Sequence, residues 1–138
     1  MGWLKAFILI AASVLAWPAW TQAPAIVCHD PLKPMLRAEL FFGRDIRGHH
    51  VVSDRQWARF LVHELTPRFP DGLTVIDGRG QTRNGEDAVM REHTKVVVIV
   101  TADAGGVRAR IAAVVAAYKE LFDQSSVGVV LQPVCAAF

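Results

Sequence analysis

Five charged residues in the middle of the sequence could together hold a ligand. They are Asp71, Asp77, Arg91, Glu92 and Lys95. If this segment folds back on itself as a hairpin, Arg91 or Lys95 can pair with a carboxylate and present a site for a small anionic or carbonyl ligand. The competing interpretation is a set of surface ion pairs, each contributing little to stability, that keeps an edge strand soluble. The residue types favour ordinary ion pairs and keep a small-molecule ligand as the alternative.

One end of this cluster lies in the segment from Thr66 to Gly78, TPRFPDGLTVIDG. Pro67 is expected to end a helix, because the residue before a proline is pushed out of the α region. The Pro-Asp-Gly sequence that follows is typical of a turn. Most residues of the segment therefore have a structural explanation. Arg68 and Asp71 have the weakest one, and we treat both as candidate ligand-binding residues.

The sequence contains five histidines, which raises the question of a metal site. His49 and His50 are adjacent in a polar stretch, and adjacent histidines in a loop seldom bind one ion together. His63 precedes a glutamate but lacks the second histidine of a zinc-protease helix. We predict no metal and no cofactor, and keep His49 and His50 as candidate ligand-binding residues. The sequence also lacks a GxSxG nucleophile motif and a glycine-rich phosphate loop.

The first 25 residues predict a secretory signal peptide. Lys5 carries their one charge, a mostly apolar run extends from Ala6 to Trp17, and Ala23-Pro24-Ala25 offers a small-x-small cleavage pattern. We therefore expect residues 26–138 to form a single exported domain, periplasmic or secreted. An uncleaved membrane anchor is the alternative, although a span needs about 20 apolar residues and Pro18 interrupts this run.

The charge of the predicted mature domain argues against a nucleic-acid partner. Removing Lys5 lowers the basic residues from 15 to 14, against 13 acidic residues, so the net charge is +1. No stretch combines clustered cations with stacking aromatic residues, as nucleic-acid binding would require. The 52% apolar composition is ample for one hydrophobic core.

The only two cysteines, Cys28 and Cys135, lie near the two ends of the predicted domain. Export would place them in an oxidising compartment, where a disulfide is the simplest interpretation. It would close a loop of about 100 residues, worth about 4 to 5 kcal/mol in the chain-entropy model. A lipid-modified Cys28 and free catalytic thiols are the two alternatives. The β-branched Val27 disfavours the first, because lipoprotein signals place a small residue before the cysteine.

Hydrophobic periodicity predicts the elements that would position these side chains. An irregular lead-in occupies residues 26–34, and a polar surface loop occupies residues 44–52. A Ser53–Gln56 capping box predicts the start of the first helix, and Asp103 is the expected cap of the second. Glycines at 78 and 80 predict a bulge or a twist in the second strand, and Asn84-Gly85 is a hairpin signal. The expected order is a strand at 35–42, a helix at 53–66, strands at 73–83 and 88–101, a helix over about 103–122, and a strand at 127–132 ended by Pro133.

This order of strand, helix, strand, strand, helix, strand predicts an α+β, ferredoxin-like split βαβ sandwich. In that fold two helices cover one face of a four-stranded antiparallel sheet and leave the other face bare. Phe41 and one side of the VVVIV run at 96–100 would point to the bare face. Exposed apolar surface usually finds a partner, so we expect a homodimer that pairs two bare faces. Alternatively, the lead-in and the C-terminal tail fold over that face.

Several stretches of the chain resemble a family of exported bacterial domains of unknown function. The resemblance rests on ELFFGRDI, VSDRQWARFL, TPRFPDGLTVIDGRGQ, KVVVIV and AAYKELF, with a cysteine near the end. It covers about Ala38 to Phe138, and TPRFPDGLTV is its most specific part. The chain departs from it at Thr82, where an aromatic residue is expected, and at Ala102, where a proline is expected. The resemblance implies no activity and no catalytic residues.

Three functional hypotheses follow from the sequence. The first is a small exported binding or interaction module that forms a dimer through its sheet. The second is an enzyme of the dimeric α/β barrel type that acts on a small molecule, with a site at Arg91, Glu92 or the His49-His50 pair. The third is an envelope-associated structural protein held by an uncleaved N-terminal anchor, so that a membrane contact depends on that segment.

Overall fold

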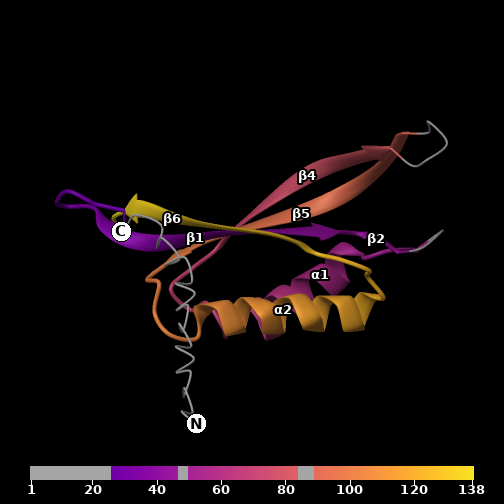
Figure 1. Cartoon of the computed structure of the whole chain (residues 1–138). Helices are drawn as coiled ribbons and strands as arrows, with labels where there is room; N and C mark the ends of the chain where they lie inside the picture. Colours follow the sequence, from indigo (N-terminus) through magenta and orange to yellow (C-terminus); the bar gives the residue numbers. More distant parts are fainter. Residues whose placement is uncertain (1–25, 47–49, 84–88) are drawn as a thin grey trace, which may run out of the picture.

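The computed structural model describes residues 26–46, 50–83 and 89–138 (Figure 1). The predicted signal peptide and the Asn84-Gly85 hairpin signal lie outside these residues. No helix in the described ranges has the length and apolar character needed to cross a membrane. The elements in chain order are β1 (Lys33–Gly43), β2 (Asp45–Ile46), β3 (His50–Val51), α1 (Asp54–Phe60), η1 (Leu61–Leu65), β4 (Thr74–Arg83), β5 (Val89–Thr101), α2 (Val107–Phe122) and β6 (Gly128–Ala136).

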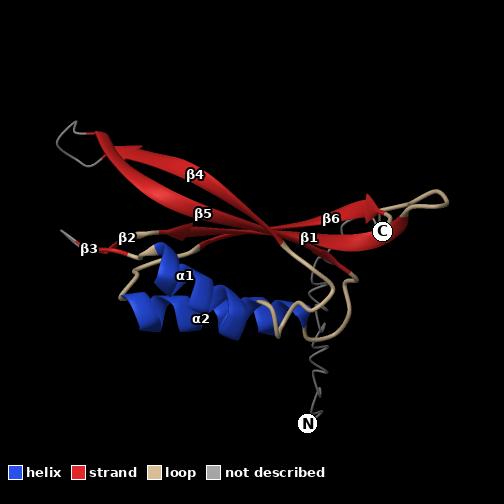
Figure 2. Cartoon of the chain, turned by 180° about the vertical axis from the view of Figure 1, so that it is seen from behind, coloured by secondary structure: helices blue, strands red, loops and turns tan. Residues whose placement is uncertain are grey.

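The predicted fold is confirmed. Four strands form one sheet in the order β4-β5-β1-β6, and every neighbouring pair is antiparallel. Both helices lie on the same side of this sheet, as Figure 2 shows. The arrangement is a split βαβ sandwich. We call the side that packs against the helices the covered face and the opposite side the open face.

The pleat of β1 decides which residues enter the core. Leu36, Ala38, Leu40 and Phe42 alternate along the strand and are all buried on the covered face. The ring of Phe42 lies 4.7 Å from that of Tyr118 on α2 and 5.3 Å from that of Trp57 on α1, measured between centroids; Phe60 and Phe122 extend the same cluster. Aromatic rings thus join both helices to the central strand.

The first helix begins as its sequence predicts and ends in a less regular way. Ser53 is the N-cap, its hydroxyl accepts a hydrogen bond from the Gln56 backbone N–H, and the Gln56 side chain accepts one from the Ser53 N–H, which completes the capping box. After Phe60 the backbone continues as one π-helical turn, η1, up to Leu65. Pro67 lies just beyond it, so the predicted stop holds to within two residues.

Two predicted boundaries are wrong. Asp103 does not cap α2: the N-cap is Gly106, at φ +92°, and Asp103 instead lies 3.8 Å from Arg108 in an exposed ion pair. Pro133 does not end the last strand, because β6 continues through it to Ala136. β6 is an edge strand, and an edge strand tolerates a proline where its N–H would have faced solvent.

The predicted surface loop at residues 44–52 contains backbone pairing that the sequence did not indicate. β2 and β3 form a short antiparallel ladder in which Asp45 is paired with Val51. Arg44 holds the base of this ladder, since its Nε donates to the Val52 carbonyl oxygen at 2.7 Å. The short ladder therefore leads from β1 directly to the N-terminus of α1.

The choice between a bulge and a twist at Gly78 and Gly80 is resolved by the ladder of β4 and β5. The register is unbroken through both glycines, with Gly78 paired with Thr94 and Gly80 paired with Glu92. No bulge interrupts it. In Figure 1 this pair of strands twists strongly away from β1 and β6, as glycine-containing strands do readily.

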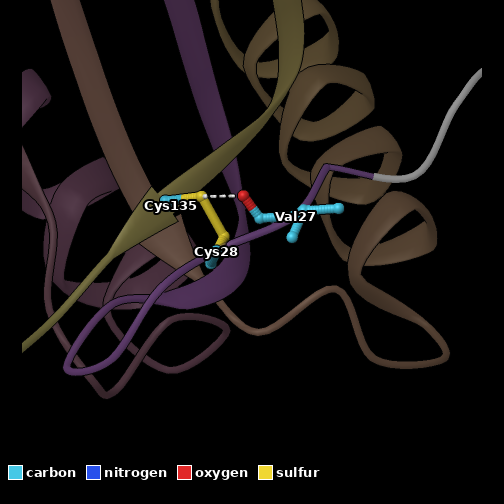
Figure 3. Close-up of a disulfide and its surroundings, with 3 residues drawn as sticks. All are labelled: Val27, Cys28 and Cys135. Carbon is cyan, nitrogen blue, oxygen red and sulfur yellow. Dashed lines mark hydrogen bonds between the residues drawn. A yellow bond between two sulfur atoms is a disulfide. The ribbon is translucent and has the colours of Figure 1, made fainter.

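The predicted disulfide is present and closes the two ends of the domain. Cys28 and Cys135 are 107 residues apart in the sequence, and their Cα atoms lie 5.6 Å apart (Figure 3). Cys135 is paired with Pro34. Pro34 lies two residues from the buried Leu36 on β1, so Cys135 is on the covered side of the sheet. Its sulfur lies 3.7 Å from the Val27 carbonyl oxygen. Since a disulfide sulfur carries no proton, this contact is van der Waals in nature.

The lead-in does not cover the open face within the described residues, and the C-terminal tail only approaches it, at a hollow that Phe138 lines with Val98 and Val100. The disulfide anchors the lead-in from the covered side, and Val27 remains 78% exposed. At the other end, Phe138 reaches the rim of a hollow beside Met35 but is itself 97% exposed. Phe41 and Val130, which belong to the open face, stay accessible.

Candidate functional site

The pleat of β5 divides the charged cluster between the two faces of the sheet. Lys95 is paired with Phe42 and with Asp77, so it lies on the covered face. Glu92 and Thr94 alternate with it and lie on the open face, where Thr94 is paired with Gly43. Residues that are neighbours in the sequence therefore form two separate polar groups, one on each side of the sheet.

The covered-face group is an ion-pair network that is complete by itself. Lys95 is only 8% exposed; its ammonium forms an ion pair with Asp77 and lies 3.9 Å from the Asp54 carboxylate at the start of α1. Asp54 also pairs with Arg44, at 3.0 Å. The hydrogen bond from Lys95 lowers the pKa of Asp77 below its usual value. These contacts join β5 and β4 to the entry of α1, as structural ion pairs do.

The open-face group lies in a hollow of about 500 Å³. Glycines at 78 and 80 on β4, 43 on β1 and 128 on β6 contribute to its lining. Where a glycine stands, the sheet presents backbone instead of a side chain, and the surface is lower by the height of that missing side chain. Phe41 and Val96 form an apolar wall, and Gln124, Ser125 and Ser126 from the loop before β6 form a polar rim.

Glu92 and Thr94 provide the chemistry of this hollow. A Cβ atom on Gly43 would lie 3.0 Å from Glu92 Oε2, so the carboxylate rests directly over that glycine. Thr94 is 9% exposed, and its Oγ1 would lie 3.3 Å from a Cβ atom on Gly80. Neither side chain has a hydrogen-bond or ion-pair partner within the described residues. The site thus has two free polar groups at the base of a glycine-lined hollow.

A hydrogen bond from the core fixes the base of the hollow. The Tyr118 hydroxyl on α2 donates to the Gly43 carbonyl oxygen at 2.9 Å, from the face opposite to Glu92. Burial raises the pKa of Tyr118 to about 12, with the nearby Glu92 charge acting in the same direction and Arg44 opposing it. The phenol is therefore a constant donor at neutral pH, and it holds the glycine backbone in place beneath the carboxylate.

Arg68 and Asp71 are not brought to this hollow. Arg68 Nη1 donates to the Glu64 backbone carbonyl at 2.7 Å and to its carboxylate at 2.8 Å, so it satisfies an orphan carbonyl at the end of η1. Asp71 is exposed in the turn before β4, on the rim of a second hollow at the opposite end of the open face. The contacts with Glu64 account for Arg68, whereas Asp71 is placed only by the turn, in which Gly72 adopts φ +123°.

The remaining candidates contribute less. Arg91 is exposed and paired with Gln81, away from Glu92 by the alternation of the strand. His50 takes part in the β2–β3 ladder through its backbone, while His49 lies outside the described residues. In the portions of the chain that the structure describes, no group of three or more histidine, cysteine or acidic side chains is arranged to hold a metal ion.

Sequence reasoning identified Glu92 but missed Thr94 and the glycines that surround it. In the sequence, Gly78 and Gly80 indicate only a bulge or a twist, and Gly43 gives no signal of a hollow. The signal that could have found the hollow is the register, because it places Gly43 and Gly78 on either side of Thr94 and Gly80 beside Glu92. That register depends on which strands are neighbours, and the sequence does not state it.

The comparisons with known proteins place the chain in a family and support its fold. A family model described as a protein of unknown function (DUF3574) matches residues 37–138. A solved structure of a phage SAM lyase in complex with S-methyl-5'-thioadenosine is similar over 74% of this chain and 90% of its own, at 14% identity and a TM-score of 0.57. The same enzyme type in its apo state gives 15% identity and 0.55, with 74% and 84% covered. At such identities the likeness shows the fold alone. No curated protein matches the sequence.

Proposed function

This chain belongs to the DUF3574 family of proteins of unknown function, and we propose that it is a small exported binding or interaction module that forms a homodimer through its open face. One observation carries this proposal: the centre of the open face is apolar and exposed. We call this surface the open-face strip; it consists of Phe41, Ile76, Val96, Val98, Val100 and Val130.

The strip reaches all four strands through Phe41, while Glu39 stands between Val98 and Val130. Ile76, Val96 and Phe41 stand in one row, on β4, β5 and β1, and Val98 and Val130 belong to the next row. Ile76 is 50% exposed and Val130 is 48% exposed. A contiguous apolar surface of this kind on a small domain is typical of an interaction site.

The charges beside the strip favour self-association. Arg37 and Glu39 both lie on the open face of β1, and their side chains form an ion pair at 2.6 Å. The pair brings no net charge to the surface, so two copies can approach each other without repulsion. A two-fold dimer places the same patch on both subunits, and an apolar strip with an internally neutralised ion pair suits such a self-complementary contact.

The disulfide supports export. A bridge between Cys28 and Cys135 persists in an oxidising compartment, as expected after cleavage of residues 1–25. Mass spectrometry of the protein recovered from expressing cells tests this part of the proposal. A mature N-terminus at Ile26 is the expected result, whereas a chain that retains residues 1–25 would favour the envelope-anchored alternative.

Light scattering of the mature domain tests the dimer. We expect twice the monomer mass at high micromolar concentration, and a monomer for the Ile76→Glu and Val130→Glu variants, because each buries a charge in the contact. Leu121→Glu is the matched control: Leu121 is 60% exposed on α2, on the opposite side of the molecule. A wild-type chain that remains monomeric, or a control that dissociates equally, would refute the sheet dimer.

An enzyme acting on a small molecule is the second candidate. The hollow around Glu92 and Thr94 favours it, as does a fold similar to that of a phage SAM lyase. The test is to incubate the mature domain with SAM and to measure S-methyl-5'-thioadenosine by chromatography, with Glu92→Gln as the control. Release that depends on Glu92 would support the enzyme; absence of release leaves the binding module as the better account.

A further inference from the structure

The hollow on the open face owes its shape to the register of three strands. On β5, Glu92 and Thr94 are successive open-face residues. Their partners on β4 are Gly80 and Gly78, and the partner of Thr94 on β1 is Gly43. Thr94 is thus flanked on both sides by glycine backbone, and Glu92 is flanked by glycine backbone on the β4 side. Any larger residue at 43 or 80 would contact the Glu92 side chain, at 3.0 Å and 3.3 Å respectively.

Thr94 is the residue that points to a ligand. Its side chain is nine-tenths buried, it lines the hollow, and its hydroxyl has no hydrogen-bond partner within the described residues. No polar side-chain atom of the described residues is both sealed from solvent and unpartnered. The Thr94 hydroxyl is therefore accessible only through the hollow, where a bound group can reach it.

Glu92 gives the hollow its charge. Its carboxylate lies over Gly43 and has no cation within ion-pair distance in the described parts of the chain. Two cations of low exposure, Lys95 and Arg44, form ion pairs with Asp77 and Asp54 instead. Arg79 also lines the rim, but its register with His93 assigns it to the covered face. Asp45 on β2 is a second acid among the lining residues, so the polar end of the hollow carries more negative than positive charge.

From these contacts we infer that the hollow is a binding site for a small organic cation that carries a primary ammonium group. A primary ammonium has three donors and no acceptor, which matches a free carboxylate and a free hydroxyl that can accept. The rings and methyl groups of Phe41 and Val96 give the apolar body of the ligand a wall to pack against, and an exposed aromatic face also attracts a cation.

The hollow shares Phe41 and Val96 with the open-face strip, so in the proposed dimer this part of its wall faces the second copy. The hollow is complete within one chain, and dimerisation is measured as a mass whereas ligand binding is measured as a titration. A protein that proves monomeric can still bind the ligand, and a protein that proves dimeric can still show no ligand binding.

The probe is phenethylamine, which combines an ammonium group with an aromatic body. Nitrogen–proton NMR of the mature domain follows its titration. We expect saturable shifts of the amide signals of Gly43, Gly78, Gly80, Glu92 and Thr94. Two analogues serve as ligand controls, the neutral 2-phenylethanol and the anionic phenylacetate, and we expect both to bind at least about tenfold more weakly because they cannot pair with a carboxylate.

Three variants test the residues. Glu92→Gln keeps the shape and removes the charge, Thr94→Val keeps the shape and removes the hydroxyl, and Gly80→Ala fills the hollow. Because each variant removes hydrogen bonds to the ligand, we expect Glu92→Gln to lower the affinity roughly tenfold or more and Thr94→Val to lower it about threefold to tenfold. Glu39→Gln is the matched control, because Glu39 is an acid on the same face outside the hollow, and we expect unchanged affinity.

Thermal melts of every variant establish that it is folded before its affinity is compared. Since Glu92 is exposed, its replacement is expected to leave the fold intact. Equal binding of phenethylamine and 2-phenylethanol would overturn the inference, as would an affinity that Glu39→Gln lowers as much as Glu92→Gln. Absence of any shift with phenethylamine at millimolar concentration would also overturn it.

Discussion

Phe41 and Phe42 are neighbours in the sequence and lie on opposite faces of the same strand. Phe42 is fully buried among the rings of Trp57, Phe60 and Tyr118, whereas Phe41 is 37% exposed on the open face. On both faces the central residues are apolar. The difference is that the two helices pack against the covered face, whereas no described part of the chain packs against the open face.

The polar residues of β5 show the same difference between the two faces. Lys95, on the covered face, has two carboxylate partners. Thr94, on the open face, is buried to almost the same extent and has none within the described residues. A region that serves only the fold satisfies its polar groups, and a region that leaves them unsatisfied is a candidate for binding. Separate substitutions on the two faces test this contrast.

The largest effect is expected from truncating the two phenylalanines separately. Phe42→Ala should lower the free energy of unfolding by about 3 to 5 kcal/mol, because it opens a cavity in the aromatic cluster. Phe41→Ala should cost about 1 kcal/mol or less, since its ring is already partly in water. Urea denaturation of both variants measures the difference. Equal costs would mean that the open face is as much a part of the core as the covered face.

Removal of the disulfide should come next. Replacing Cys28 and Cys135 together by serine should lower the free energy of unfolding by about 2 to 5 kcal/mol, through the loop that the bridge closes in the unfolded chain. Because the bridge anchors the lead-in on the covered side, the oligomeric state should not change. Chemical denaturation measures the first effect and light scattering the second. A change of mass on removing the bridge would show that the lead-in contributes to the open face.

Ionisation of Tyr118 should be displaced to high pH. It is the only tyrosine, so the ultraviolet absorbance of tyrosinate reports on it alone. We expect a midpoint near pH 12 in the folded protein, because burial raises its pKa. The unfolded chain loses this proton near its usual pKa of about 10. The contribution to stability is therefore complete below about pH 10 and is lost as pH rises toward about 12.

Tyr118→Phe separates that effect from the titration of lysines. The variant should lack the decrease in stability between about pH 10 and pH 12 that comes from Tyr118. Comparing the free energy of unfolding of the wild type and the variant across this pH range measures the effect. At neutral pH it should cost about 1 kcal/mol for the lost hydrogen bond to Gly43. A wild-type midpoint near pH 10 would contradict the buried environment of the ring.

The smallest effect is expected at Thr94. Thr94→Val removes a hydroxyl that has no partner, so the free energy of unfolding should stay within about 0.5 kcal/mol of the wild type or rise slightly. Lys95→Met is the comparison on the covered face. Removing the ammonium abolishes the ion pair with Asp77, which should lower the free energy of unfolding by about 1 kcal/mol. A Thr94→Val variant that is clearly destabilised would show that the hydroxyl serves the fold.

Much of the fold was predictable because it depends on short-range patterns. Alternation of apolar residues identified β1, a helical period identified α2, and Ser53 with Gln56 identified the start of α1. The misses occurred where a local signal competed with tertiary context. Asp103 has the chemistry of a cap but α2 begins at Gly106. Pro133 is a strand breaker that an edge strand accommodates.

The candidate site was less predictable for the same reason. Glu92 was identified by its charge, but Lys95 and Asp77 were grouped with it although the pleat places them on the other face. Arg68 was singled out as unexplained, and its role is to bind the Glu64 carbonyl at the end of η1. A contact of this kind depends on where the helix ends, and the π-helical turn that sets this end left no periodic signal.

By itself, the amino-acid sequence determined the order of the main elements and the fold class, because periodicity and composition act over a few residues. It made a disulfide the simplest interpretation of the two cysteines, and the structure shows that bridge. The tertiary structure alone decided that Gly43, Gly78 and Gly80 surround Glu92 and Thr94. These residues come from three strands, and their meeting depends on strand order and register. Both are set by how the covered face packs on the helices, so the core decides what the open face presents.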